Sequence, residues 1–191
     1  MEEIEVKFLN IDPNSIDKKL KSLGAERIFE RLYRRRVFDY PDLRLDKQGA
    51  WLRIRDEGDK VTMSYKQRLG MKDREASQND KSMEEIETTV GNFEKMAEIM
   101  LKIGLTEKFY QENRRIRYML KDIEFDIDFW PELEPYLEIE APSWEKVNEG
   151  IRLLGLEPGD KKIMSSTQIY GLKGIVDTDY KEMTFKGMIK K

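Results

Sequence analysis

The chain has 191 residues, which is enough for one domain with a buried core. It carries 35 basic and 38 acidic residues, and this near balance, with an isoelectric point near 5.4, argues against a general nucleic-acid binder. There is no Cys and no His, which excludes thiolate nucleophiles, imidazole bases and Cys or His metal ligands. Catalysis would therefore use carboxylates, Lys, Arg, Tyr and hard metal ions.

No apolar stretch approaches the roughly 20 residues of a membrane-spanning helix. The first residues, MEEIEVKF, lack the features of a signal peptide. We therefore expect a cytoplasmic protein that binds neither membrane nor nucleic acid.

The first third of the chain predicts strands around one helix. Residues 2–9 alternate apolar and charged side chains, which is typical of a strand. A helix is expected over 12–23, with Asn14 or Ser15 near its cap and Gly24 just past its end. Further strands are expected over 27–39, 50–56 and 60–68. In the first of these, the pattern leaves open which arginine faces inward: Arg34, Arg35 or Arg36.

The rest of the chain continues the same alternation. Residues 69–80 have no period and predict a loop. Strands are expected over 83–90, 112–120, 122–129 and 136–141, and helices over 92–103, 143–154 and 162–172. We therefore predict an α+β fold with a single domain over 1–175 and a basic C-terminal tail over 176–191.

The polar faces of these strands carry an unusual set of charges. The acids are Glu3, Glu5, Glu85, Glu87, Glu124, Asp126, Asp128, Glu138 and Glu140. The bases are Lys7, Arg53, Arg55, Lys66, Arg115 and Arg117. One interpretation is that they form ordinary solvated faces, because antiparallel sheets commonly have one wet face.

A second interpretation explains why the signs are segregated by strand, as Glu-x-Glu, Arg-x-Arg and Asp-x-Asp pairs. Residues two apart on a strand lie on one face, about 7 Å apart. Paired carboxylates can share a hard cation, and paired guanidinium groups suit phosphate oxygens. If the strands close into a barrel with these faces inside, the interior must stay wet and hold a charged guest. The pattern then predicts a metal–polyphosphate site.

The motifs resemble those of the CYTH superfamily, the triphosphate tunnel metalloenzymes. The start, Glu3-Ile4-Glu5-Val6-Lys7, resembles the family's E-x-E-x-K signature. The family's later motifs follow in order, as WLRIR at 51–55, SYK at 64–66, EIE at 85–87, RIR at 115–117, IDF at 127–129 and LEIE at 137–140. The family includes class IV adenylyl cyclases, thiamine triphosphatases and inorganic tripolyphosphatases.

The resemblance implies an eight-stranded antiparallel β-barrel with helices packed outside. It implies that the triphosphate is bound by Lys7, Arg53, Arg55, Lys66, Arg115 and Arg117. It implies that one or two Mg²⁺ or Mn²⁺ ions are held by Glu3, Glu5, Glu87, Asp128, Glu138 and Glu140. Within these sets, Glu5, Lys7 and Glu140 are expected to be catalytic.

The sequence departs from the family pattern at one position. Relatives often carry an Arg two residues before the middle Glu pair, where this chain has Met83. Lys81 or Arg74 could supply that cation instead. The roles of Glu85 and Asp126, which share the parity of the motif residues, stay open.

Three functions are compatible with this pattern. The first is a metal-dependent phosphohydrolase acting on inorganic tripolyphosphate or on a nucleoside or organic triphosphate. The second is an adenylyl cyclase that makes cyclic AMP and pyrophosphate from ATP; Trp51, Tyr33 or Tyr65 could then stack on the base, although aromatic residues on strands usually belong to the core. The third is a non-catalytic polyphosphate-binding module. The expected partner is a triphosphate-containing small molecule, and the protein would be a monomer or homodimer.

Overall fold

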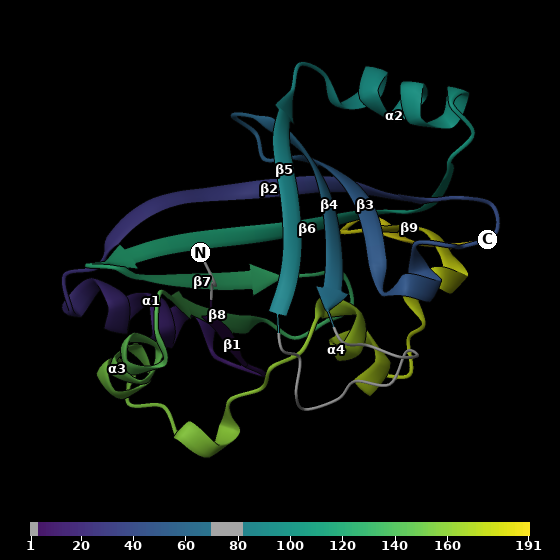
Figure 1. Cartoon of the computed structure of the whole chain (residues 1–191). Helices are drawn as coiled ribbons and strands as arrows, with labels where there is room; N and C mark the ends of the chain where they lie inside the picture. The colour runs from purple at the N-terminus through teal and green to yellow at the C-terminus, as the bar shows by residue number, and fades with distance from the viewer. Residues whose placement is uncertain (1–3, 70–81) are drawn as a thin grey trace. The chain divides into compact units, whose positions relative to one another are not determined.

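The computed structural model describes residues 4–69 and 82–191. Its strands are β1 (Ile4–Phe8), β2 (Glu26–Asp39), β3 (Ala50–Asp56), β4 (Val61–Leu69), β5 (Ser82–Val90), β6 (Thr106–Leu120), β7 (Ile123–Phe129), β8 (Tyr136–Ala141), β9 (Tyr180–Thr184) and β10 (Gly187–Lys190). Its helices are α1 (Pro13–Ser22), α2 (Phe93–Lys102), α3 (Trp144–Leu154) and α4 (Ser166–Leu172). These elements confirm the α+β class (Figure 1).

Eight strands follow one another in the hydrogen-bonded order β1-β8-β7-β6-β2-β3-β4-β5. The registers of β1 with β8, β8 with β7, β7 with β6, β2 with β3, β3 with β4 and β4 with β5 are all antiparallel. The antiparallel sheet of the expected fold is therefore confirmed. Closure of these strands into a barrel remains a prediction.

The chain divides into two compact units, and each is built from two stretches of sequence. Unit 1 consists of Met1–Arg31 and Asn113–Val176, and unit 2 consists of Leu32–Glu112 and Asp177–Lys191. The long strands β2 and β6 each contribute residues to both units.

The core of unit 1 lies between its strands and the helices α1 and α3. Alternate residues of β1, β6, β7 and β8 supply its apolar side chains, and the helices supply Ile16, Leu20, Val147, Ile151 and Leu154. Gly150 allows α3 to approach closely, because a Cβ at this position would lie 3.0 Å from Ile139 Cγ2. The apolar side chains of the strands thus pack against the helices. The charged side chains, which alternate with them, lie on the opposite face of the strands.

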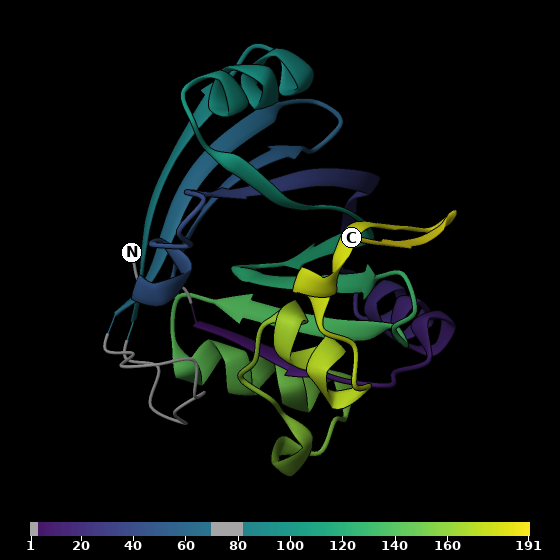
Figure 2. The ribbon, with the colours of Figure 1, turned by 90° about the vertical axis from the view of Figure 1, so that its right-hand side faces the viewer.

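The core of unit 2 is smaller and forms around α2. Phe93, Ala97 and Met100 of this helix pack against Phe38 of β2 and Ile54 of β3. Strands β3, β4 and β5 lie side by side in both views of the molecule (Figures 1 and 2). As in unit 1, the charged face of these strands is the one that the apolar cluster does not use.

The structure corrects several predicted boundaries. Asp12 caps α1 and accepts a hydrogen bond from the Asn14 amide, so the cap expected at Asn14 or Ser15 is wrong. Strand β6 begins six residues earlier than predicted, and the last predicted helix is shortened to α4. The loop expected at 69–80 lies, apart from Leu69 at the end of β4, outside the described residues.

The C-terminal segment is not a frayed tail. Strands β9 and β10 form a hairpin, and β9 pairs in parallel with β6 at Tyr110 and Gln111. Met183 of β9 is fully buried. The limits of a single domain at 1–175 stay a prediction.

In the described part of the chain, the longest helix is α3 with 11 residues, and no helix has both the length and the apolar character to span a membrane.

Candidate functional site

Charged side chains of unit 1 gather on the face of β1, β8, β7 and β6 that is opposite its core. We call this the acidic face, and its members are Glu5, Lys7, Arg115, Arg117, Glu124, Asp126, Asp128, Glu138 and Glu140. The strand registers arrange them in rows. One row runs through Lys7, Glu138, Asp126 and Arg117, and the next through Glu5, Glu140 and Glu124. Six carboxylates therefore share one face with only three cations.

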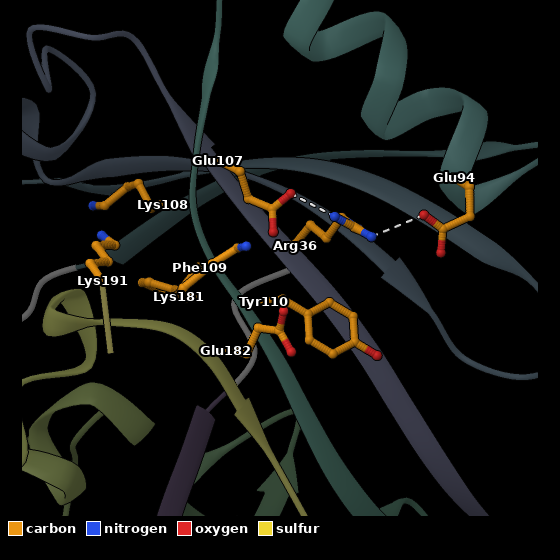
Figure 3. Close-up of a pocket in the computed structure, with 9 residues that line it drawn as sticks. All are labelled: Arg36, Glu94, Glu107, Lys108, Phe109, Tyr110, Lys181, Glu182 and Lys191. Carbon is orange, nitrogen blue, oxygen red and sulfur yellow. Dashed lines mark hydrogen bonds and ion pairs between the residues drawn. The ribbon is translucent and has the colours of Figure 1, made fainter. Parts of the chain in front are cut away.

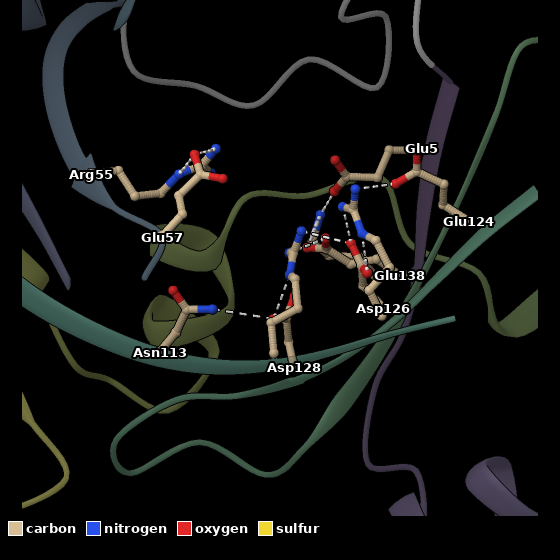
Figure 4. Close-up of polar contacts among 11 residues, drawn as sticks. Glu5, Arg55, Glu57, Asn113, Glu124, Asp126, Asp128 and Glu138 are labelled. Atoms are coloured by element: carbon tan, nitrogen blue, oxygen red, sulfur yellow. Dashed lines mark hydrogen bonds and ion pairs between the residues drawn. The ribbon is translucent and has the colours of Figure 1, made fainter. Parts of the chain in front are cut away.

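Arg115 is the centre of the acidic face. Its guanidinium donates hydrogen bonds to Asp128 at 2.9 and 2.5 Å, to Asp126 at 2.7 Å and to Glu138 at 2.5 Å. Figure 4 shows Asp126, Asp128 and Glu138 converging in this cluster. Arg115 thus gathers three carboxylates that would otherwise repel one another.

The environment of this cluster shifts the pKa values of its members in opposite directions. Burial raises the pKa of Asp128 to about 7, against the attraction of Arg115. Burial opposes the ionisation of Glu138 as well, but Arg115 and Lys7 overcome it and lower the pKa of Glu138 to about 2. Burial also works against the charge of Arg115, yet the surrounding carboxylates raise its pKa well above its usual range. Arg115 is therefore a firmly held cation.

Lys7 and Arg117 hold the remaining carboxylates. Lys7 is almost completely buried and pairs with Glu138 at 3.1 Å and with Glu5. Arg117 donates to Asp126 at 2.8 and 2.6 Å and pairs with Glu124. The structure thus brings together the predicted residues Glu5, Lys7, Arg115, Arg117, Asp128, Glu138 and Glu140 on one face, together with Glu124 and Asp126. Glu3 lies outside the described residues.

The donors of the acidic face fit the divalent cation that the sequence predicts. They are carboxylate oxygens, which hard cations such as Mg²⁺ and Mn²⁺ prefer. Glu5, Glu140 and Glu124 stand in direct cross-strand register, so three carboxylates are neighbours in one row. Like charges placed opposite one another are destabilising unless a cation lies between them. Within residues 4–69 and 82–191, however, no three carboxylates are already drawn together as a metal site.

A second set of charges lies in unit 2 on one face of β2, β3, β4 and β5. We call this the basic face, and its members are Arg35, Arg53, Arg55, Thr62, Ser64, Lys66, Glu85 and Glu87. Arg35 stands in register with Arg55, which settles the choice among the three consecutive arginines. Arg34 and Arg36 point to the other face, where they pair with Asp56 and with Glu94 and Glu107.

Arg53 is buried in the basic face without adequate partners. Its side chain is only 9% exposed, and its Nε and Nη2 atoms are buried with no hydrogen-bond acceptor among residues 4–69 and 82–191. The nearest carboxylate oxygens, on Glu85 and Glu87, are 3.7 and 3.8 Å from Nη2, which is beyond hydrogen-bonding distance. Burial, together with Arg55 and Arg35, lowers the pKa of Arg53 to about 9. Such a cation is costly for the fold unless an anion binds it.

Arg55 is held in a different way. Its Nε and Nη2 atoms donate to Glu57 Oε1 at 2.9 and 2.7 Å (Figure 4). The Thr62 hydroxyl donates to the same oxygen at 3.1 Å. The Tyr33 ring lies 5.3 Å from the guanidinium carbon. Glu57 therefore positions Arg55, and the sequence analysis missed it. Glu57 lies one residue beyond the end of β3, but it shares the odd-numbered positions of Arg53 and Arg55, and this shared parity was a usable signal.

Lys66 and the Glu pair of β5 complete the basic face. Lys66 pairs with Glu85 at 2.7 Å, and burial together with Arg53 lowers its pKa. Glu85 and Glu87 are the exposed members of the face. Trp51 is in register with Lys66 and shares this face, whereas Tyr65 lies on the other one. The side chain of Met83 and the residues Lys81 and Arg74 are outside the description.

A cavity of about 460 Å³ in unit 2 is lined by a separate group of charges. Figure 3 shows Arg36 between Glu107 and Glu94, with which it forms contacts of 2.7 and 3.0 Å. Lys108, another lining residue, donates to Asp46 at 2.7 Å. Arg36 and Lys108 are thus paired within the protein, so these two cations are less available to an anion than Arg53.

Known proteins resemble the chain in sequence and in structure. A protein of Methanocaldococcus jannaschii named "Putative adenylate cyclase MJ0240" is 34% identical over 156 residues, which cover 81% of this chain and 84% of that protein. The PH1012 protein of Pyrococcus horikoshii has a similar structure, with a TM-score of 0.70, 23% identity and coverage of 87% and 98% of the two chains. The Hippeastrum protein HpAC1, described as a "putative adenylyl cyclase" with a dominant triphosphatase activity, has a TM-score of 0.59, 17% identity and coverage of 91% and 96%.

The CYTH domain family model matches residues 1–164, which include all of the acidic face and the charged motifs of the basic face. This match agrees with the order of the charged motifs and with the strand pattern that presents them. The chain therefore belongs to the CYTH domain family.

Proposed function

We propose that this protein is a divalent-metal-dependent phosphohydrolase that cleaves a small-molecule triphosphate, either inorganic tripolyphosphate or a nucleoside or organic triphosphate. The observation that carries the proposal is Arg53, a buried guanidinium with two hydrogen-bonding atoms unsatisfied. A phosphate oxygen would supply the missing acceptors and the compensating charge. HpAC1 supports the choice, because a protein of this fold is described with a dominant triphosphatase activity.

In this proposal the basic residues bind the phosphate chain. Arg53, Arg55 and Lys66 act from the basic face, and Lys7, Arg115 and Arg117 from the acidic face. Arg55 is already oriented by Glu57, so little side-chain entropy is lost when it binds phosphate. The cations stabilise the negative charge of the equatorial oxygens, which is the main protein contribution in phosphoryl transfer.

The carboxylates would hold one or two Mg²⁺ or Mn²⁺ ions. We assign this role to Glu5, Asp128, Glu138 and Glu140 of the acidic face, to Glu87 of the basic face and to Glu3. A bound ion of this kind neutralises phosphate charge and lowers the pKa of a coordinated water. Glu5, Lys7 and Glu140 act closest to the reaction, with Lys7 pairing Glu5 until substrate binds.

Substitution Glu5→Gln tests this proposal. It removes one negative charge with almost no change in shape, so turnover of tripolyphosphate with Mg²⁺ or Mn²⁺ should fall at least about 100-fold. The melting temperature should change little, because Glu5 is partly exposed. Phosphate release is the measurement, and Glu26→Gln on an exposed position of β2 is the control. Unchanged turnover in the Glu5 variant would reject the metal assignment.

A second candidate is an adenylyl cyclase. It is favoured by the 34% identity to the relative named as an adenylate cyclase. The same charged faces would bind ATP, the substrate's own 3′-hydroxyl would attack, and pyrophosphate would leave. Incubation with ATP and Mg²⁺ or Mn²⁺ separates the candidates, since free phosphate indicates the hydrolase and cyclic AMP with pyrophosphate the cyclase. Tight binding without turnover would indicate a non-catalytic module.

A further inference from the structure

Ser64 lies beside Arg53 in the basic face and is equally unsatisfied. The two residues stand directly opposite each other in the register of β3 and β4. Ser64 is 1% exposed, and its hydroxyl oxygen is buried with no hydrogen-bond partner in the part of the chain that the structure describes. One cross-strand pair therefore carries three buried polar atoms that lack a hydrogen-bond partner within the described residues. They are Arg53 Nε, Arg53 Nη2 and Ser64 Oγ.

This concentration is unusual for a folded protein. Most buried polar side-chain atoms have a partner, and each one left unsatisfied costs about 1–3 kcal/mol. The hydroxyl of Thr62, two residues away on the same face of β4, shows the ordinary arrangement, because it donates to Glu57 at 3.1 Å. Within the described residues Ser64 thus has no structural hydrogen bond to explain its hydroxyl, and the carboxylates nearest to its neighbour Arg53 lie beyond hydrogen-bonding distance.

We propose that Ser64 and Arg53 form one anion-binding pair, in which the Ser64 hydroxyl donates a hydrogen bond to a phosphate oxygen that Arg53 also binds. The inference rests on the proposed function and adds a neutral donor to its set of phosphate ligands. Cross-strand neighbours have Cβ atoms about 5 Å apart, so both side chains can reach oxygens of one phosphoryl group. Hydrogen bonds to a charged acceptor are stronger than those between neutral groups, so the hydroxyl should contribute measurably to affinity.

The test is binding of tripolyphosphate to the full chain by calorimetry, in EDTA so that no turnover occurs. We expect Ser64→Ala to weaken binding about 10-fold and Ser64→Thr, which keeps a hydroxyl, to bind within about threefold of the unchanged protein. Thr88→Val is the matched control, because it removes a hydroxyl from the opposite face of β5; it should leave the affinity unchanged.

Thermal unfolding separates a ligand role from a structural one. Ser64→Ala should melt at the same temperature as the unchanged protein or higher, because it removes an unsatisfied buried group. Thr62→Val, which removes a satisfied hydroxyl, should melt lower. The inference is overturned if Ser64→Ala binds normally, if its melting temperature falls together with its affinity, or if the unchanged protein fails to bind tripolyphosphate in EDTA. Hydrolysis by the unchanged protein with Mg²⁺ tests the proposed function separately.

Discussion

Arg115 and Arg53 are the same residue type, each nearly buried on a charged strand face, yet their surroundings differ. Arg115 donates to three carboxylates, which raise its pKa well above its usual range. Arg53 has two atoms without acceptors, and burial lowers its pKa to about 9. Within the described residues, the guanidinium of Arg115 is hydrogen-bonded to carboxylates, whereas two nitrogen atoms of Arg53 are not hydrogen-bonded.

The two charged faces also differ in the sign of the charge that is in excess. On the acidic face the carboxylates outnumber the cations, so the face needs added positive charge. On the basic face the cations outnumber the carboxylates, and within the described residues two atoms of Arg53 have no acceptor, so added negative charge suits this face. Under the proposed function, metal ions would supply the first charge and a triphosphate the second.

The largest effect should come from Arg115→Met. This variant leaves Asp126, Asp128 and Glu138 without their shared cation, and breaking such a buried network costs about 3–5 kcal/mol. Urea unfolding followed by circular dichroism should show a correspondingly lower free energy of unfolding. Added Mg²⁺ should recover part of the loss, since it can take the place of the missing charge. An unchanged midpoint would show that Arg115 does not hold these acids.

Arg53→Met should separate stability from binding. Tripolyphosphate affinity should fall about 100-fold, because a buried charged ligand to phosphate is lost. The melting temperature should stay constant or rise by about 2–6 °C, since a desolvated and unsatisfied cation disappears. Calorimetry and thermal unfolding on one preparation measure both. A large drop in melting temperature would remove the contrast with Arg115.

Glu57→Gln should have a smaller effect that acts through Arg55. The variant weakens the hydrogen bonds that hold Arg55, so affinity for tripolyphosphate should fall about fivefold. The melting temperature should fall as well, because Glu57 is buried and accepts hydrogen bonds from Arg55 and Thr62. Glu107→Gln is the matched control, because it breaks the 2.7 Å pair with Arg36 outside the basic face. In an Arg55→Ala background, the Glu57 substitution should no longer change the affinity. A persisting effect there would mean that Glu57 contacts the ligand by another route.

Much of the fold follows from local alternation. The bounds of β3 and β8 were predicted to the residue, because one apolar and one charged face repeat without interruption. The same alternation predicted which charges share a face. The alternation could not show that Arg35 lies on the charged face, because three consecutive arginines occupy both faces of a strand. Only the pairing of Arg35 with Arg55 shows which face it lies on. The hairpin of β9 and β10 was missed because its strand pairing with β6 joins distant parts of the sequence.

The properties of the site were less accessible from sequence. Arg53 and Arg115 occur in the same Arg-x-Arg pattern, and only the positions of acceptors in space distinguish them. Glu57 was missed because it follows the strand end, and Ser64 because a neutral hydroxyl has no charge pattern. Sequence parity therefore identified residues of the candidate site, but it could not show which of them already have hydrogen-bond partners within the protein.

Strands β2 and β6 each contribute residues to both units. Because each unit combines an early and a late stretch of sequence, no single cut in the chain can release either one whole. Any cut at Arg31 or at Glu112 falls inside a strand and exposes its unpaired backbone groups. Fragments made by limited proteolysis should therefore remain associated, and isolating one face for study requires a redesigned connection instead of a truncation.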